Sequence, residues 1–342
     1  MIRLYSDSDR ERWDSFVMAS GGSTCYHLIG WKDVIEASFS HKTHYLLSEG
    51  KDGNINGILP LVHLKSMFFG NFMVSLPYFN YGGVCTDDDE VHNQLIKEAI
   101  NIAGEVKAEH IELRHTHHIQ GLQEKTSKVS MILDLPYDPD VLWNNFSSNL
   151  RRKIRKPEKE GMYLKLGGEE ELDNFYTVFS VNMRDLGTPV YSKCFFSNIL
   201  KAFPKNSRIH TVYDNKERPV ASAILIGFKE RIEMPWVSSI KSYNRYYPNT
   251  LLYWGSLKFA SELGYKLFDF GRSTPGEGTF RFKEQWGAKP IQLYWQYWIR
   301  NGGSLPNINP KNPKYQTAIR IWQKLPVKLT SLIGPYIVKN LP

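Results

Sequence analysis

The sequence is poor in cysteine: its 342 residues include only Cys25, Cys85 and Cys194, which lie far apart. An odd number of cysteines without a Cys-x-x-Cys pair argues against a disulfide framework and a cysteine-type metal site. No apolar run approaches the roughly 20 residues that span a bilayer, and the N-terminus is charged too early for a signal peptide. These absences are typical of the reducing cytoplasm, where we expect this protein to act.

What the sequence does contain is a large apolar fraction and an excess of positive charge. Hydrophobic residues make up 42% of the chain, enough for a sizeable core, and a length of 342 residues favours two domains. Lys and Arg number 43 against 35 Asp and Glu, a formal charge of +8. This excess indicates an anionic partner, such as a phosphate-bearing cofactor, a nucleic acid or a lipid surface, without choosing among them.

The two halves of the sequence repeat one order of predicted elements. In the first half, periodicity predicts helices over 9–19, 29–38 and 87–105 and strands over 3–5, 44–48, 55–64, 72–76, 110–114 and 131–135, the last closing the sheet. In the second half it predicts helices over 170–185, 192–202 and 249–264 and strands over 162–166, 208–213, 218–228, 231–238 and 267–270. Corresponding elements lie about 160 residues apart, and such self-similarity indicates duplicated domains.

These elements predict an α+β protein with two tandem GNAT-like domains, each a mostly antiparallel splayed sheet flanked by helices. The element order is that of the GNAT acyltransferase fold, in which the sheet splays to admit a pantetheine-like arm. We place the first domain at 1–138 and the second at 162–302. A basic linking helix over 139–161, broken near Pro157, joins them, and a helical tail follows at 303–342.

Residues 266–287 are predicted to form a buried strand that opens into a glycine-rich loop and a short basic-aromatic helix. Gly276 and Gly278 let the backbone approach a ligand where larger residues would not. Asp269 interrupts the strand, where an unpaired carboxylate would be costly to bury. It is a candidate base for an amine proton, and a salt bridge to Arg272 explains it equally well.

Three motifs carry a resemblance: Ser-Asn-Leu-Arg-Arg-Lys-Ile-Arg-Lys at 148–156, Asn-Met-Arg-Asp-Leu-Gly-Thr-Pro at 182–189, and Phe-Asp-Phe-Gly-Arg-Ser at 268–273 followed by Phe-Arg-Phe-Lys-Glu-Gln-Trp-Gly at 280–287. The chain resembles the FemAB-like tandem-GNAT transferases over nearly its whole length. It looks most like the branch associated with exosortase (PEP-CTERM) and exopolysaccharide gene clusters. The resemblance implies N-acyl or aminoacyl transfer to an amino group of a cell-envelope or exopolysaccharide precursor, akin to peptidoglycan bridge formation.

The resemblance also implies the donor substrates, which are acyl-CoA, acyl-carrier protein or aminoacyl-tRNA, with no tightly bound cofactor. Two departures bear on the donor. Some relatives carry a long helical hairpin thought to engage tRNA, and no heptad run of that kind occurs here. Acetyl-CoA enzymes hold pyrophosphate with a turn that contains an arginine and two glycines. At the matching place this sequence keeps the arginine, Arg245, but lacks both glycines. Asn249 begins the next helix and is suited either to an anion at the helix N-terminus or to a plain N-cap.

The resemblance assigns Lys283 to donor phosphate or to charge that develops in the transition state, and its place beside Gly276 and Gly278 permits this role. Two arginines are accessory phosphate ligands in this hypothesis, Arg272 and Arg281. A solvated basic face is the alternative for all three cations. No nucleophile with a partnered base is evident, because Cys194 begins an apolar helix, so we expect direct attack without a covalent enzyme intermediate.

Acceptor-binding residues rest mainly on the resemblance. The candidates in the second domain are Arg184, Asp185, Tyr191 and Tyr253. The first domain, which is degenerate, offers the loop 75–83 with Tyr78, Asn80 and Tyr81 as the lining of a groove, although core packing and a tight turn explain it equally well. Arg152, in the basic stretch 151–156, is expected to steer an anionic substrate.

The remaining expectations concern partners. His110, His115, His117 and His118 are a weak metal pattern, and we predict no metal. We expect an anionic cell-envelope or polysaccharide precursor as the main partner, with tRNA as another candidate and no DNA. The tail mixes basic and apolar residues as a peripheral membrane helix does, and packing on the second domain is the alternative. The alternative function is a non-catalytic GNAT-derived scaffold for a membrane polysaccharide assembly system.

Overall fold

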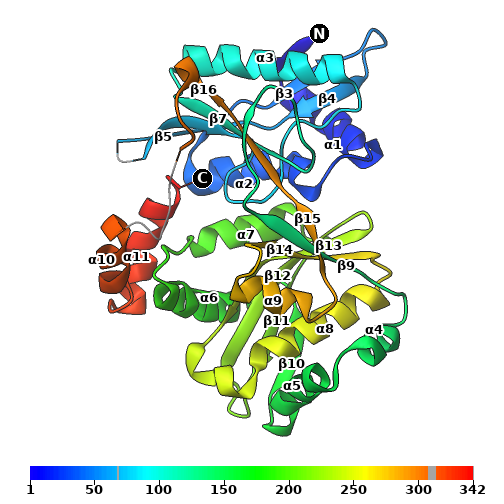
Figure 1. Ribbon diagram of the computed structural model, residues 1–342, viewed down its shortest axis with the longest axis vertical. Helices are drawn as coiled ribbons and strands as arrows, with labels where there is room; N and C mark the ends of the chain where they lie inside the picture. Colours follow the sequence, from blue (N-terminus) through cyan, green and yellow to red (C-terminus); the bar gives the residue numbers. More distant parts are fainter. Residues whose placement is uncertain (68, 307–312, 342) are drawn as a thin grey trace. The chain divides into compact units, whose positions relative to one another are not determined.

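The chain folds around separate sheets in two units (Figure 1), and the computed structural model describes residues 1–67, 69–306 and 313–341. Unit 1 comprises Met1–Val129, the segment that begins at Gln292, and the last residues from Lys339. Unit 2 comprises Ser130–Ile291 and the C-terminal helices through Val338. The chain thus enters unit 2 at Ser130, before the expected boundary at 138, and returns to unit 1 at Gln292, before the expected boundary at 302.

Unit 1 contains a small sheet and a larger one. Its strands are β1 (Ile2–Leu4), β2 (Lys42–Thr43), β3 (Leu46–Glu49), β4 (Ile55–Leu59), β5 (Val62–Ser66), β6 (Gly70–Val74), β7 (His110–His115), β8 (Gln123–Lys125) and β16 (Tyr294–Ile299). Its helices are α1 (Arg10–Ala19), α2 (Gly30–Phe39) and α3 (Asp89–Glu105). The small sheet has the order β1-β3-β4 and the larger one β2-β5-β6-β7-β16-β8. Pro60 divides the predicted strand 55–64 between the two sheets, because proline has no N–H for a ladder.

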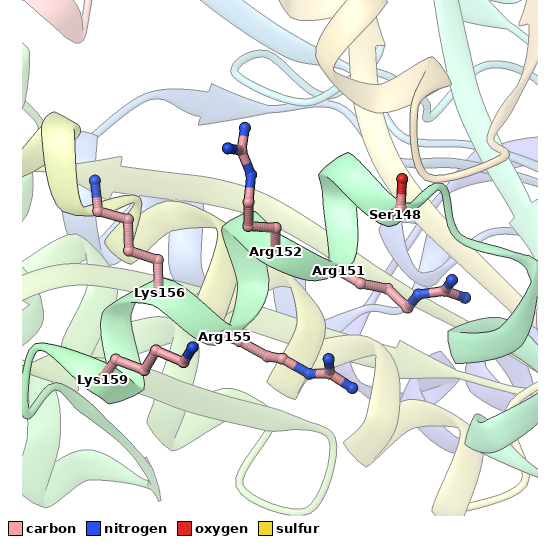
Figure 2. A pocket seen from close by; sticks show the side chains of 6 residues that line it. All are labelled: Ser148, Arg151, Arg152, Arg155, Lys156 and Lys159. Atoms are coloured by element: carbon pink, nitrogen blue, oxygen red, sulfur yellow. The ribbon is translucent and has the colours of Figure 1, made fainter.

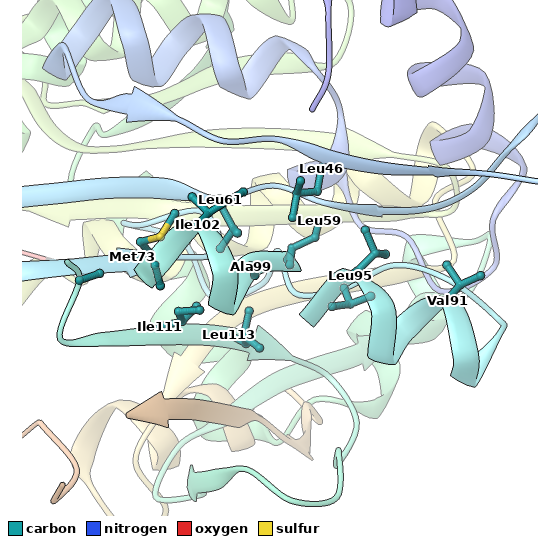
Figure 3. Close-up of a cluster of buried hydrophobic side chains, with 13 residues drawn as sticks. Leu46, Leu59, Leu61, Met73, Val91, Leu95, Ala99, Ile102, Ile111 and Leu113 are labelled. Carbon is teal, nitrogen blue, oxygen red and sulfur yellow. The ribbon is translucent and has the colours of Figure 1, made fainter. Parts of the chain in front are cut away.

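The amphipathic helix α3 covers the core of unit 1 (Figure 3). The Asp88 side chain caps it by accepting hydrogen bonds from two backbone amides of the first turn. Its buried residues recur every three or four positions and pack against apolar residues of the strands; they include Val91, Leu95, Ala99 and Ile102. Leu95 and Ala99 are fully buried, so this helix face provides much of the apolar burial of the unit.

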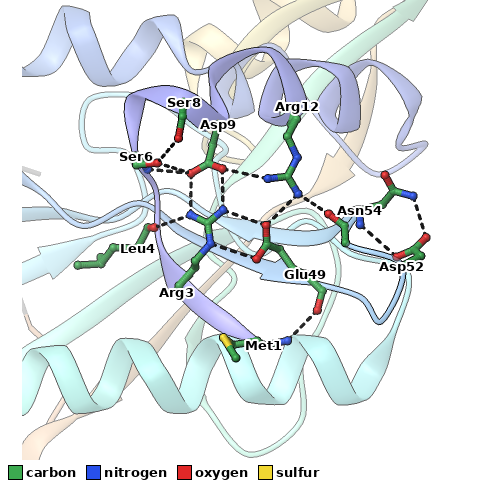
Figure 4. A network of polar contacts seen from close by, with 11 residues as sticks. Met1, Arg3, Leu4, Ser6, Ser8, Asp9, Arg12, Glu49, Asp52 and Asn54 are labelled. Atoms are coloured by element: carbon green, nitrogen blue, oxygen red, sulfur yellow. Dashed lines mark hydrogen bonds and ion pairs between the residues drawn. The ribbon is translucent and has the colours of Figure 1, made fainter.

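A network of ion pairs fastens the N-terminal strand of unit 1 (Figure 4). Arg3 contacts Asp9 at 2.6 Å and Glu49 at 2.9 Å, and Arg12 contacts the same two acids at 3.1 and 2.8 Å. The Arg3 guanidinium holds the pKa of Asp9 well below its usual value. Because Glu49 ends β3, the network joins α1 to the small sheet and reinforces the pairing of β1 with β3.

Unit 2 is built on one larger sheet. Its strands are β9 (Val129–Asp134), β10 (Tyr163–Gly167), β11 (Ser207–Tyr213), β12 (Pro219–Phe228), β13 (Arg231–Ser239), β14 (Leu267–Ser273) and β15 (Lys289–Gln292), in the order β10-β11-β12-β13-β14-β9-β15. Its helices are α4 (Pro139–Asn145), α5 (Ser148–Lys159), α6 (Leu172–Leu186), α7 (Lys193–Ala202), α8 (Pro248–Glu262), α9 (Gly278–Glu284), α10 (Pro313–Trp322) and α11 (Val327–Val338). None of the helices within the described ranges is both long and apolar enough to cross a membrane.

The expected linking helix is two helices, α4 and α5. Ser147 separates them and caps α5, since its hydroxyl accepts the amide of Leu150 at 3.2 Å. Pro157 lies inside α5 and does not end it, because the helix continues to Lys159. The break predicted near this proline is therefore wrong.

The repeated plan is visible in both sheets. Each sheet contains a parallel pair joined by a helix, β6-α3-β7 in unit 1 and β13-α8-β14 in unit 2. The pairing is short in both. It ends at Val74↔Glu112, where β6 itself ends, and at Glu233↔Asp269, after which β13 and β14 continue without pairing. We call Glu112 and Asp269 the fork acids, because each lies where the pairing of its parallel pair ends.

Each unit also receives a strand from the other half of the sequence. β9 precedes the linking helices yet lies between β14 and β15, and β16 follows β15 yet lies between β7 and β8. The prediction that 131–135 closes the first sheet is therefore wrong. An alternating or apolar strand pattern reports the faces of a strand and carries no information about which strand lies beside it.

Each exchanged strand supplies a hydroxyl to the fork acid of the sheet that it enters. Tyr297 of β16 donates to Glu112 at 2.8 Å, and Ser130 of β9 donates to Asp269 at 2.7 Å. Glu112 also pairs with Arg114 at 2.7 Å. Burial alone would raise the pKa of Glu112, but Arg114 and Tyr297 outweigh it and lower this pKa below its usual value.

Two buried histidines predict acid sensitivity. Burial, as the largest cause, lowers the pKa of His115 and of His210 to about 3, so both are neutral in the folded protein. The unfolded chain binds these protons near the ordinary histidine pKa, so stability is full above that value and is lost as pH falls below it. Between pH 7 and 5 each histidine should cost about 2 kcal/mol of the free energy of unfolding.

Urea unfolding at the two pH values checks this expectation. His210→Asn should reduce the loss between pH 7 and 5 by about 2 kcal/mol. Equal pH slopes in the wild type and His210→Asn would contradict a neutral buried imidazole.

Candidate active site

The parallel pair of unit 2 divides into an open fork. β13 and β14 pair from Arg231↔Leu267 to Glu233↔Asp269, and both then continue, to Ser239 and Ser273. Because α8 connects the end of β13 to the start of β14, it begins at the edge of the sheet where the strands have separated. α9 follows the end of β14, so the chain brings the start of α8 and all of α9 to this edge.

The fork acid of unit 2 is held inside the fold. Asp269 is fully buried, and one of its oxygens accepts Ser130 Oγ and the Gly271 amide, each at 2.7 Å. Its other oxygen lies 3.8 Å from the guanidinium of Arg231. Arg231, at the start of the neighbouring strand, is thus an ion-pair partner that the sequence did not indicate. Partnered and buried, Asp269 positions the end of β14.

Lys283 joins α9 to the end of β14. Its Nζ donates to the carbonyl oxygens of Gly271 and Arg272, both at 2.9 Å, and the side chain is only 8% exposed. Burial, together with the nearby Arg272, lowers the pKa of Lys283 to about 8, although Asp269 acts in the opposite direction. Lys283 can therefore gain or lose a proton near neutral pH. In this structure its Nζ donates hydrogen bonds to backbone carbonyl oxygens.

The glycine loop between β14 and α9 is open. Gly276 has φ of +79°, in the left-handed region, and no atom lies within 4 Å of where a Cβ would stand on it or on Gly278. Arg272 and Arg281 are exposed on either side of this loop in the sequence. The three predicted cations thus divide: Lys283 points into the fold, and the two arginines face solvent.

The start of α8 differs from the expected cap. Tyr247, with φ of +61°, is the N-cap, and Pro248 is the first helical residue, so the N-cap alternative for Asn249 is wrong. Among the described residues, Asn249 Oδ1 is buried and has no hydrogen-bond partner. Arg245, just before the helix, is exposed and stacks on the ring of Tyr246 at 4.6 Å.

Cations of α5 surround this helix start. The ammonium groups of Lys153 and Lys156 lie 5.8 and 5.2 Å from the ring centre of Tyr247, and Lys156 donates to the Arg245 carbonyl at 2.8 Å. The same helix lines a hollow of about 450 Å³, shown in Figure 2, with the residues Ser148, Arg151, Arg152, Arg155, Lys156 and Lys159. Arg152 and Lys156 extend in the same direction, one turn apart. Such a surface is suited to an anion.

The predicted acceptor residues of unit 2 have structural partners. Arg184 and Asp185 form an ion pair at 2.7 Å near the end of α6. Tyr191 packs on Phe195, with ring centres 5.1 Å apart. Tyr253 is buried against Phe270, with ring centres 5.4 Å apart, and burial raises its pKa.

The predicted loop 75–83 belongs to unit 1. Tyr78 donates to the Lys339 carbonyl at 2.7 Å, Asn80 accepts the indole N–H of Trp295 at 3.3 Å through its backbone, and Tyr81 is buried. Within unit 2, the structure brings Lys283, Asp269 and Arg272 to one strand end.

Sequence reasoning missed two residues of this region, Ser130 and Arg231. Helical spacing indicated that α5 is basic but not which helix start it lies beside, and no local pattern points to Ser130 or Arg231. Across the parts of the chain that the structure describes, no group of three or more His, Cys, Asp or Glu is placed to hold a metal ion.

Comparison with known proteins agrees with this architecture. Residues 144–284 match a family described as acetyltransferase (GNAT) domain. The crystal structure of FemX aligns over 88% of this chain and 98% of its own, with a TM-score of 0.68 and 16% identity. No curated protein matches the sequence significantly.

Two further structures align over most of the chain. L-PGS from Bacillus licheniformis covers 97% of this chain and 99% of its own, with a TM-score of 0.56 and 15% identity. A tandem GNAT protein from the clavulanic acid biosynthesis pathway covers 90% and 99%, with a TM-score of 0.57 and 11% identity. The predicted α+β fold with tandem GNAT-like domains is confirmed.

Proposed function

We propose that unit 2 transfers an acyl or aminoacyl group from an anionic activated donor to an amino group. The observation that carries the proposal is the set of cations around the start of α8, at the edge where β13 and β14 separate. The first turn of a helix favours negative charge because its amides and dipole point outward. Here Lys153, Lys156 and Arg245 add full positive charges to that turn.

Acyl-CoA is the donor that the match to the acetyltransferase (GNAT) family favours, and its phosphates fit this cationic surface. The glycines missing from the turn before α8 would have supplied backbone amides, and the lysines of α5 take their place. Acyl-carrier protein and aminoacyl-tRNA carry phosphate as well and stay within the proposal.

The proposed reaction is direct. The neutral amine attacks the carbonyl carbon of the donor, a C–N bond forms, and the bond to the leaving sulfur or oxygen breaks. The amine loses a proton and the leaving group takes one up. Lys283, with a pKa of about 8, is suited to exchange a proton at neutral pH. Asp269 acts as a positioning residue, since it is buried and fully engaged by Ser130 and Gly271.

The acceptor in this proposal is the amino group of a cell-envelope or exopolysaccharide precursor. An anionic precursor would be attracted by the same excess of positive charge. Arg184 and Tyr191 are the residues of unit 2 proposed to contact it, from the end of α6 and the turn that follows it.

Thermal stabilisation tests the donor site directly, because a ligand that binds only the folded state raises the melting temperature. Coenzyme A, acyl-CoA species and aminoacyl-tRNA are compared on the wild type, on Lys153→Ala/Lys156→Ala and on the control Lys201→Ala, an exposed lysine of α7. A ligand at 100 times its Kd should stabilise the wild type and the control by about 2.7 kcal/mol. The double variant Lys153→Ala/Lys156→Ala should lose most of this stabilisation.

Two outcomes would count against this assignment. Stabilisation that persists in the double variant would place the donor elsewhere. The absence of any stabilisation, in the wild type as well, would favour the non-catalytic scaffold. Ribonuclease separates the donor classes, since it destroys stabilisation by aminoacyl-tRNA alone.

A further inference from the structure

The C-terminal helix α11 exposes its large apolar side chains and buries its small ones. Its inner face carries Thr330, Gly334 and Val338, all buried. Its outer face, which we call the α11 face, carries four large side chains with exposed fractions of 38%, 66%, 38% and 68%: Leu329, Leu332, Ile333 and Tyr336. These positions are spaced i, i+3, i+4 and i+7 and therefore form one continuous stripe.

Packing on unit 2 fixes this orientation. α11 lies against α6, and a Cβ built on Gly334 would stand 2.7 Å from the backbone nitrogen of Val190. Only glycine permits so close an approach, and Leu or Ile cannot replace the small residues of this face without displacing the helix. The apolar stripe consequently cannot turn inward, and its exposure is a property of the folded unit.

The charge around the stripe has one sign. No Asp or Glu follows Glu284 in the sequence, whereas Lys and Arg occur at eight later positions. Three of these are exposed: Arg320 on α10, Lys324 between the two helices, and Lys328 in the first turn of α11. An apolar stripe whose own segment of the chain carries cations and no acids is complementary to a surface that is apolar inside and anionic at its rim.

We propose that the α11 face docks on an anionic lipid surface, with the helix lying in the plane of the headgroups. Leu332, Ile333 and Tyr336 enter the boundary of the acyl chains, and Lys324 and Lys328 contact lipid phosphates. This arrangement removes exposed apolar area from water, and the tyrosine places its hydroxyl at the polar level of the membrane. The inference is independent of the proposed function, because it involves no residue of the candidate active site.

Binding of the full chain to vesicles tests the proposal. Co-sedimentation is measured with phosphatidylglycerol-phosphatidylcholine vesicles and with phosphatidylcholine vesicles. The wild type should bind the anionic vesicles, and added salt should weaken this binding. Leu332→Ser/Ile333→Ser should lower the partition coefficient about tenfold or more, and Lys324→Gln/Lys328→Gln should lower it about fivefold for each lysine.

The control is Leu263→Ser, at a leucine that is 60% exposed at the end of α8, which should leave the partition coefficient unchanged. Urea midpoints verify that every variant is folded. Equal binding by wild type and Leu332→Ser/Ile333→Ser, or no binding to anionic vesicles, would overturn the proposal. So would a sedimentation equilibrium result in which wild type self-associates and that variant is monomeric, since the α11 face would then contact a second copy.

Discussion

A fragment of residues 130–291 is expected to unfold cooperatively, whereas a fragment of residues 139–291 is not. The longer fragment contains the seven strands of the unit 2 sheet except Val129 of β9 and Gln292 of β15, and the shorter one lacks β9 altogether. Without β9, β15 has no neighbour, and the fully buried Asp269 loses Ser130 and its cover. Loss of β9, together with the pairing that it gives β14 and β15, should remove a large part of the 5–15 kcal/mol by which domains are typically stable.

Circular dichroism during urea unfolding measures this difference. The matched control restores the strand: residues 130–136 joined to the shorter fragment should return the cooperative transition. Ser130→Ala in the longer fragment should cost only about 1–3 kcal/mol, because it removes one hydrogen bond to the fork acid. Equal transitions in the two fragments would contradict the assignment of β9 to this sheet.

Lys283→Ala is expected to reduce transfer about 100-fold or more, with a smaller effect on stability. The substitution removes the two hydrogen bonds to the carbonyls of Gly271 and Arg272, which costs about 1–3 kcal/mol. Relief of a buried charge offsets part of this cost, because the pKa of Lys283 is already lowered by burial. α9 and the glycine loop should consequently loosen while the sheet persists.

Three measurements separate these effects: the transfer rate with the donor identified by thermal stabilisation, the free energy of unfolding, and hydrogen exchange of the amides from 271 to 279. The control is Lys289→Ala, which removes an exposed ion pair with Asp134 and should change each by little. If Lys283→Ala retained both the wild-type rate and the protection of the loop, Lys283 would have no part in the site.

Periodicity and capping predicted most of the elements, because these signals are local. The helix predicted at 87–105 is α3 at Asp89–Glu105, with Asp88 as its cap. The strand predicted at 267–270 continues to Ser273, so the glycine loop is shorter than expected. The partner of β9 was missed, since the neighbour of a strand is decided by contacts between distant segments.

The sequence indicated several of the residues that belong to the candidate site, but it did not indicate which atoms those residues contact. The sequence indicated that Lys283 lies beside a glycine loop, but a lysine bound to two carbonyls has no local signature. The ion pair between Arg231 and Asp269 depends on the register of β13 against β14. Likewise, Lys156 meets the start of α8 only because α5 packs on that helix.

The fork acids and the exchanged strands also bear on ancestry. In a protein with a single unit, the same contacts would arise if two identical copies traded their last strand, each hydroxyl then reaching the acid of the other copy. Joining two such genes end to end would leave β9 in unit 2 and β16 in unit 1, as observed. Tyr297 on Glu112 and Ser130 on Asp269 would then be descendants of one ancestral contact, altered separately once the halves were free to diverge.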